Sequence, residues 1–137
     1  MSVVRSCLVL LLATALPLGA QQEARHEEGE QIFSLVCAMC HSVNPPAKAA
    51  PPISHAAAYY IRRHDDRDAA VLAMVSFLKE PAAERSVLPP HAVERFGLMP
   101  PQVHLSDAQL RAVARYALSL ADTVHVGPGH RHGGGTP

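Results

Sequence analysis

The segment Cys37-Ala38-Met39-Cys40-His41 constrains this chain more than any other part of its sequence. It places two thiols three positions apart and an imidazole directly after the second thiol. This spacing is typical of a site where haem is attached covalently. The two sulfurs add to the two vinyl groups at one porphyrin edge, and the adjacent imidazole then lies beneath the iron as an axial ligand. We therefore predict one covalently bound haem c.

Two other interpretations of the cysteine pair fit the sequence less well. A redox dithiol of the thioredoxin type opens a helix after a β-strand, whereas Cys37 follows a helical pattern. A zinc site needs four ligands, and the third cysteine, Cys7, lies in a segment that we expect to be removed. His55 and His64 are too far apart in the sequence for the usual pair of zinc-binding histidines.

Residues 1–20 have the pattern of a secretory signal peptide. Arg5 precedes an apolar run over residues 7–16, and small residues follow it. This run is about ten residues long, which is too short to span a bilayer. We expect cleavage after Ala20, export to the periplasm, and a mature protein that is not embedded in a membrane.

The composition is consistent with one small domain whose core is largely supplied by a cofactor. The chain has 137 residues, with no tryptophan, three tyrosines and three phenylalanines. A porphyrin supplies the large apolar surface that such a core lacks. Twelve Lys/Arg balance twelve Asp/Glu, so nothing indicates nucleic acid as a partner.

The rest of the chain shows helical periodicity and no strand signal. Residues 21–28 are polar, and we expect a loose leader there. Residues 123–137 are rich in glycine and histidine and predict a flexible tail, to which we assign no metal site. We expect helices over residues 29–40, 54–62, 66–80 and 106–122, with prolines breaking the chain between 44 and 52.

Caps and apolar stripes support these helices. Ser54 is the expected N-cap of the second helix, and Asp65 or Asp66 that of the third. Ser106 and Gln109 form a capping box at the start of the last helix. The expected buried positions are Val71, Leu72, Val75 and Leu78 on the third helix, and Leu110, Val113, Ala114, Ala117 and Leu118 on the last.

These parts together resemble class I cytochrome c. The resemblance covers most of the chain after residue 28 and implies an all-α fold, a small helical bundle around one haem, over residues 29–122. It implies that Gly29 and Phe33 on the first helix meet Tyr116 on the last at a close crossing, where glycine lets two backbones approach. The residues that carry it are Gly29, Ile32, Phe33, Cys37, Cys40, His41, Leu98-Met99-Pro100-Pro101, Leu110 and Tyr116.

The family pattern also implies partners for the haem histidine. A proline carbonyl in the family accepts a hydrogen bond from the other nitrogen of that histidine, and either Pro51 or Pro52 fills this place. Met99 is the expected sixth ligand, because it precedes two stiffening prolines shortly before the last helix. Methionine ligation raises the reduction potential relative to two histidines.

Other side chains compete for the sixth position. His55, His64, His91 and His104 are alternatives that we interpret individually as surface residues. Met39 lies inside the attachment segment, too close to the histidine side to cross the ring. Met74 lies on a predicted helix and is more consistent with core packing.

A six-coordinate haem with one exposed edge exchanges single electrons and has no vacant position for a substrate. We therefore expect an electron carrier rather than an enzyme, either a monomer or a subunit of a redox complex. Its partners would be a periplasmic dehydrogenase or quinol-oxidising complex and a terminal oxidase, reductase or peroxidase, bound through weak contacts. The alternatives are a haem subunit of a dehydrogenase or sulfur-oxidising complex, or a gas-binding or sensing haem with Met99 unbound. A peroxidase-like haem ranks last.

Overall fold

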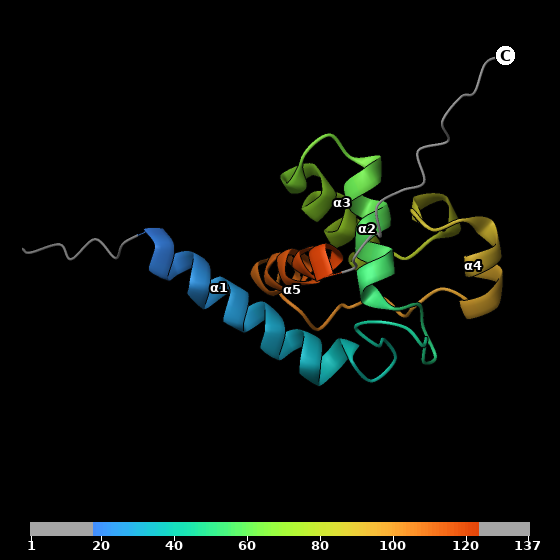
Figure 1. Cartoon of the computed structure of the whole chain (residues 1–137), viewed down its shortest axis with the longest axis horizontal. Helices are drawn as coiled ribbons and strands as arrows, with labels where there is room; N and C mark the ends of the chain where they lie inside the picture. The colour runs from blue at the N-terminus through green and yellow to red at the C-terminus, as the bar shows by residue number, and fades with distance from the viewer. Residues whose placement is uncertain (1–17, 124–137) are drawn as a thin grey trace, which may run out of the picture.

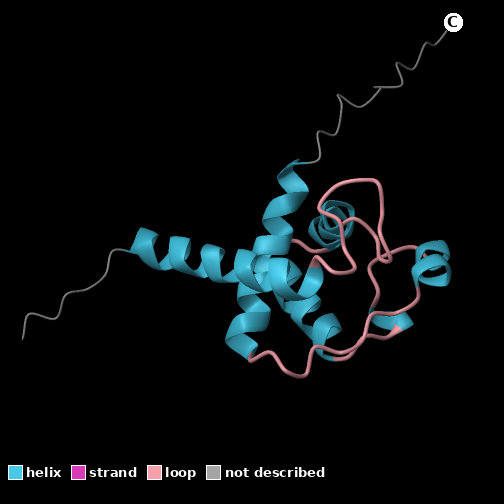
Figure 2. Ribbon diagram, turned by 90° about the horizontal axis from the view of Figure 1, so that it is seen from below, coloured by secondary structure: helices cyan, strands magenta, loops and turns pink. Residues whose placement is uncertain are grey.

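A computed structural model of the chain describes residues 18–123 (Figure 1). These residues form helices and loops and contain no strand, which confirms the all-α expectation. The longer helices lie together on one side of the molecule, and the long loops lie on the other side with short helices among them (Figure 2). The α-helices are α1 (Leu18–Ile32), α2 (Ile53–Arg63), α3 (Arg67–Lys79), α4 (Pro90–Phe96) and α5 (Asp107–Ser119), and the short turns are η1 (Phe33–Cys37), η2 (Ala83–Arg85) and η3 (Leu120–Thr123).

Helix α5 is the element on which α1, α2 and α3 pack. It begins with the predicted capping box: Gln109 N–H donates to Ser106 Oγ at 3.3 Å, and Ser106 N–H donates to Gln109 Oε1 at 3.0 Å. These bonds pair backbone N–H groups that have no partner inside the helix. Its predicted apolar stripe is buried, which confirms Leu110, Val113, Ala114, Ala117 and Leu118 as core residues.

The crossing of α1 and α5 is as close as the resemblance implies. A Cβ atom on Gly29 would lie 2.3 Å from the backbone oxygen of Ala112 and 2.8 Å from Tyr116 Cβ. Beside this contact, the rings of Phe33 and Tyr116 lie 5.6 Å apart. Gly29 is therefore required by the packing of two backbones.

The expected loose leader at residues 21–28 is wrong, because these residues are helical. Helix α1 begins at Leu18 rather than at Gly29 and extends beyond the bundle (Figure 1). The polar stretch lacks an apolar stripe, and its residues from 19 to 28 are exposed. It is nevertheless composed mostly of good helix formers such as Ala, Gln, Glu and Arg, so the packed helix continues outward without a break.

The expected cap of α2 is also wrong. Pro52 is the N-cap residue and no side chain caps the helix. Ser54 lies inside the first turn and is fully buried, and its Oγ has no hydrogen-bond partner in the described residues. In contrast, Asp66 caps α3 as predicted, since its Oδ1 accepts from Ala69 N–H at 2.7 Å.

One residue of the α3 stripe was predicted wrongly. Leu72 is 51% exposed, whereas Val71, Val75 and Leu78 are buried. Positions 71, 75 and 78 follow the spacing of one helix face, and Leu72 is turned about 100° from Val71. Met74 is buried at 5% exposure on this face, which confirms its packing role.

Helix α4 is absent from the predicted elements. Its first residue is Pro90. Gly97 follows its last residue and has a φ of 72°, which takes the chain out of the helix. Its seven residues are too few to display an apolar period, and none of them is buried. The proline and the glycine are the signals by which it can be recognised.

Most of the predicted signal peptide and the predicted tail fall on residues 1–17 and 124–137, outside the described part of the chain. Within residues 18–123 no helix combines the length and the apolar character that crossing a membrane requires.

Candidate haem site

The turn that follows α1 brings the two cysteines and the histidine together. Turn η1 is a single π turn, in which Ala38 N–H donates to Phe33 O at 2.8 Å. Cys37 O then accepts from two N–H groups, that of Cys40 at 3.1 Å and that of His41 at 2.9 Å. A π turn inside a helix frequently marks a functional site. Here the π turn ends the helix at Cys37, and the chain then makes a tight turn that continues to His41.

His41 is held by a backbone carbonyl, and the structure selects Pro51 over Pro52. His41 Nδ1 lies 2.7 Å from Pro51 O. Because a carbonyl only accepts, Nδ1 carries the proton and donates, and Nε2 keeps its lone pair for a metal. Burial lowers the pKa of His41 from its usual value, and the hydrogen bond to Pro51 only partly opposes this shift. The imidazole is therefore neutral at neutral pH, as iron ligation requires.

The segment from residue 42 to 52 is tied to this turn by further hydrogen bonds. Ala50 N–H donates to Cys40 O at 3.0 Å, and Ile53 N–H donates to Ser42 O at 2.9 Å. The Lys48 ammonium donates to Ala38 O at 2.8 Å. The proline-rich loop consequently has a defined path back to the histidine, and Pro51 O is fixed at its end.

The two thiols are not arranged as a redox dithiol. Cys37 is half-buried and Cys40 is exposed. Burial, and to a smaller extent the neighbouring Cys40, raise the pKa of Cys37 to about 11. A nucleophilic cysteine of the thioredoxin type needs a lowered pKa. Cys37 is therefore a neutral thiol at neutral pH in the absence of haem.

Met99 lies in the loop that follows α4. It is half-buried and packs against the same core cluster as Cys37, Val43 and Ile53. Gly97 turns the chain out of α4 two residues before it. A thioether in this position has an apolar setting, which suits a soft ligand to iron.

The competing histidines are less well placed. His55, His91 and His104 are exposed, in agreement with their interpretation as surface residues. His64 differs, because it is partly buried and stacks on Tyr60 with ring centroids 6.2 Å apart, and its Nε2 has no hydrogen-bond partner among the described residues. Among residues 18–123 no three His, Cys, Asp or Glu side chains form a group that can hold a metal ion.

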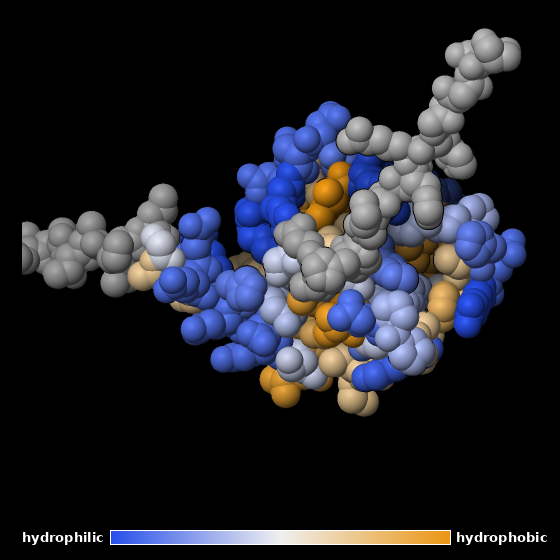
Figure 3. Space-filling view, viewed as in Figure 1, coloured by the Kyte–Doolittle hydropathy of each residue, from blue (hydrophilic) through white to orange (hydrophobic). Residues whose placement is uncertain are grey.

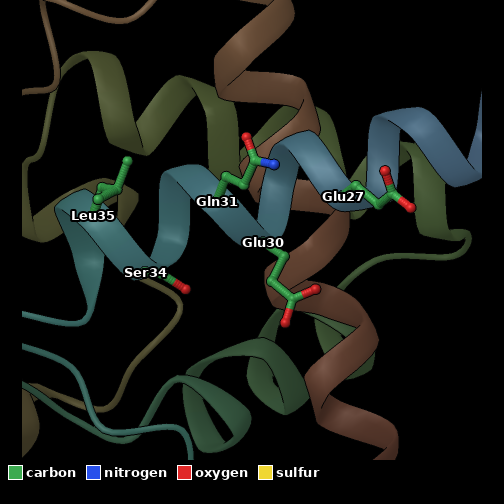
Figure 4. Close-up of a pocket in the computed structure, with 5 residues that line it drawn as sticks. All are labelled: Glu27, Glu30, Gln31, Ser34 and Leu35. Carbon is green, nitrogen blue, oxygen red and sulfur yellow. The ribbon is translucent and has the colours of Figure 1, made fainter.

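Two further hollows lie on the described surface. A shallow pocket of about 490 Å³ lies against one face of α1 and η1 (Figure 4). Figure 4 shows that Gln31 and Glu30 leave the helix in opposite directions, so the polar groups do not converge. A second hollow of about 340 Å³ lies between the proline-rich loop, α2 and α4, and includes His55 and His91 in its wall.

The surroundings of His41 fit a covalently attached haem. The side chains around the cysteine turn and Met99 are apolar and half-buried, and they continue the core. Leu35 and Met39 beside the cysteines are each 79% exposed. Figure 3 shows apolar surface at the lower edge of the molecule, below the end of α1. Two thiols, a neutral imidazole with one free nitrogen, and an apolar wall are the chemistry that haem c needs.

Comparison with known protein families agrees with this geometry. The family model for cytochrome c matches residues 26–121, so the chain belongs to the cytochrome c family. Members of this family bind covalent haem c and transfer electrons, and one haem suits a domain of this size. Neither the curated proteins nor the solved structures contain a significant match to this chain.

Proposed function

We propose that this protein is a periplasmic monohaem cytochrome that carries single electrons between redox partners. Cys37 and Cys40 form the thioethers, and His41 and Met99 are the axial ligands. The observation that carries the proposal is the hydrogen bond from His41 Nδ1 to Pro51 O beside the two-cysteine turn. That bond fixes the tautomer and the ring orientation of His41, as is usual for a histidine that binds a metal.

The residues of the chain act by holding the cofactor still. When bound, the haem supplies an iron that changes oxidation state by one electron. The thioethers and the His41–Pro51 pair keep the ligand side rigid, and the Met99 thioether favours ferrous iron and raises the potential relative to a second imidazole. With His41 and Met99 both bound to the iron, no position would be open to a substrate, and electron transfer would need little structural change.

The proposed partners are a periplasmic dehydrogenase or quinol-oxidising complex as donor and a terminal oxidase, reductase or peroxidase as acceptor. Exposed apolar side chains beside the cysteine turn suit brief contacts of small area. The equal numbers of acidic and basic residues in the chain argue against strong charge steering to either partner.

Replacing Met99 tests the sixth ligand. We expect Met99→Ala to keep its haem on a denaturing gel, to lose the weak far-red absorption of a sulfur–iron bond, and to bind carbon monoxide readily in the ferrous state. The control is Met74→Leu, which alters a buried methionine on α3. This volume-conserving change should leave the far-red band intact. A wild-type spectrum without that band would exclude methionine ligation and favour a sensing or catalytic haem.

Export is tested by intact mass. Protein purified from the periplasm should begin at Gln21 and carry one haem on its two cysteines. Cleavage after Ala20 would remove only the first three residues of α1, which begins at Leu18. A mass that retains residues 1–20, or a protein confined to the cytoplasm, would contradict the proposed location.

A further inference from the structure

Gln102 is a buried polar residue in the loop between Met99 and α5. Its backbone connects that loop to the core, and its side chain makes a hydrogen bond within the loop. The residue is 9% exposed. Its backbone N–H donates to Leu78 O, at the C-terminal end of α3, at 2.8 Å. Its side-chain Nε2 donates to Pro100 O, also at 2.8 Å. Pro100 directly follows Met99, so the amide of Gln102 holds the chain next to the sulfur.

Burying this side chain has a cost that packing alone does not justify. Its Oε1 is buried and has no hydrogen-bond partner in the described structure. A buried amide that leaves one group unpaired lowers the stability of the fold, whereas an apolar residue of similar size avoids this loss. The hydrogen bond to Pro100 is the feature of this residue that an apolar side chain cannot supply.

The other side of the Met99 loop is attached more weakly. Helix α4 ends two residues before Leu98, with Gly97 N–H donating to Val93 O at 2.8 Å. None of the residues of α4 is buried, and α4 has no extensive contact with another described helix. An element with few buried contacts opens easily. The position of Met99 therefore depends mainly on the hydrogen bonds of Gln102, which follows it in the chain.

The exposed ion pair near Gln102 contributes little to holding the Met99 loop in place. Lys79 and Asp107 form an ion pair of 2.6 Å between the end of α3 and the start of α5. Both side chains are largely exposed, and such pairs contribute little to stability. The hydrogen bond from Gln102 N–H to Leu78 O joins the loop directly to α3, and the side-chain bond to Pro100 O holds the loop itself in shape.

We propose that Gln102 is a positioning residue that holds the Met99 loop in place for sulfur ligation of the haem iron. This inference rests on the proposed function, in which Met99 is the sixth ligand. By fixing Pro100 and by tying the loop to Leu78, Gln102 keeps the thioether at the iron against competing ligands. Its loss favours the state in which the loop is open and another ligand takes the sixth position.

The test is a titration of free imidazole into the ferric, haem-loaded protein. Imidazole competes with Met99, so its apparent affinity measures how firmly the loop holds the sulfur. The variant is Gln102→Leu, which keeps side-chain volume and removes the hydrogen bond to Pro100. We expect it to bind imidazole about tenfold more tightly than the wild type, because the part-buried hydrogen bond to Pro100 O is lost and the closed state of the loop is destabilised. The far-red band of the variant should weaken without added ligand.

The same substitution at Gln109 is the matched control. Gln109→Leu breaks the capping box of α5, seven positions further along the chain, and the hydrogen bond it removes is to Ser106 rather than to Pro100. It should lower the melting temperature and leave the imidazole affinity unchanged. Equal imidazole affinity in Gln102→Leu and the wild type, with the far-red band present in both, would overturn the positioning role alone. Absence of that band from the wild type would overturn the assignment of Met99, and the positioning role with it.

Discussion

A protein in which Cys37 and Cys40 are both replaced by alanine is expected to carry no covalent haem. Both thioether bonds depend on these sulfurs, and the Cys37–His41 segment contains no other thiol. A denaturing gel stained for haem should show a band for the wild type and none for this variant. Single replacements should each leave at most one thioether, with weakened or lost staining.

Met39→Ala is the matched control for that experiment. Met39 lies between the two cysteines but is 79% exposed, so its side chain contributes neither a bond nor a buried contact in the described structure. The control should stain like the wild type. Undiminished staining of the double cysteine variant would refute the attachment site, and loss of staining in Met39→Ala would mean that the segment tolerates no change of side chain.

Gly29→Ala is expected to cause the second large effect, on folding. The added Cβ would lie 2.3 Å from Ala112 O, a backbone atom that cannot rotate away. The helices α1 and α5 must then separate, which disturbs the contact between Phe33 and Tyr116. Overpacking of this kind costs about 2 to 3 kcal/mol. Thermal unfolding of the haem-loaded protein should show a melting temperature lower by roughly 10 °C.

The comparison for Gly29→Ala is Gln31→Ala, an exposed change two positions further along α1. Alanine is a good helix former, and surface substitutions of this type usually change stability by less than about 0.5 kcal/mol. A Gly29→Ala protein as stable as Gln31→Ala would show that the two helices separate at little cost in stability. The close approach of α1 and α5 would then not be required for a stable fold.

Both experiments address features that are also readable in the sequence, but the structure changes how each is understood. The cysteine and histidine positions follow from spacing. The fold adds that a π turn precedes the segment and that Cys37 O accepts from both Cys40 N–H and His41 N–H. The spacing identifies the chemistry, and the turn explains how the three side chains lie close together.

The local features of the helices were predictable because they depend on neighbours in the chain. The capping box of Ser106 and Gln109, the cap at Asp66 and the buried stripe of α5 all arise from residues within one or two turns of each other. The start of α1 at Leu18 is not predictable, because it does not depend on a local signal. Its polar outer part has no stripe to signal a helix, and it is helical as a continuation of a packed segment.

The cofactor chemistry and the helical class can be predicted from consecutive residues, since the attachment segment and the apolar periods are local features. Three other features depend on tertiary packing: Pro51 rather than Pro52 holds His41, Ser54 is buried rather than capping, and Gln102 joins the Met99 loop to α3. Each of these depends on a contact between segments that are placed relative to one another only when the helices pack. Spacing along the chain carries no information about such distances until the core has formed.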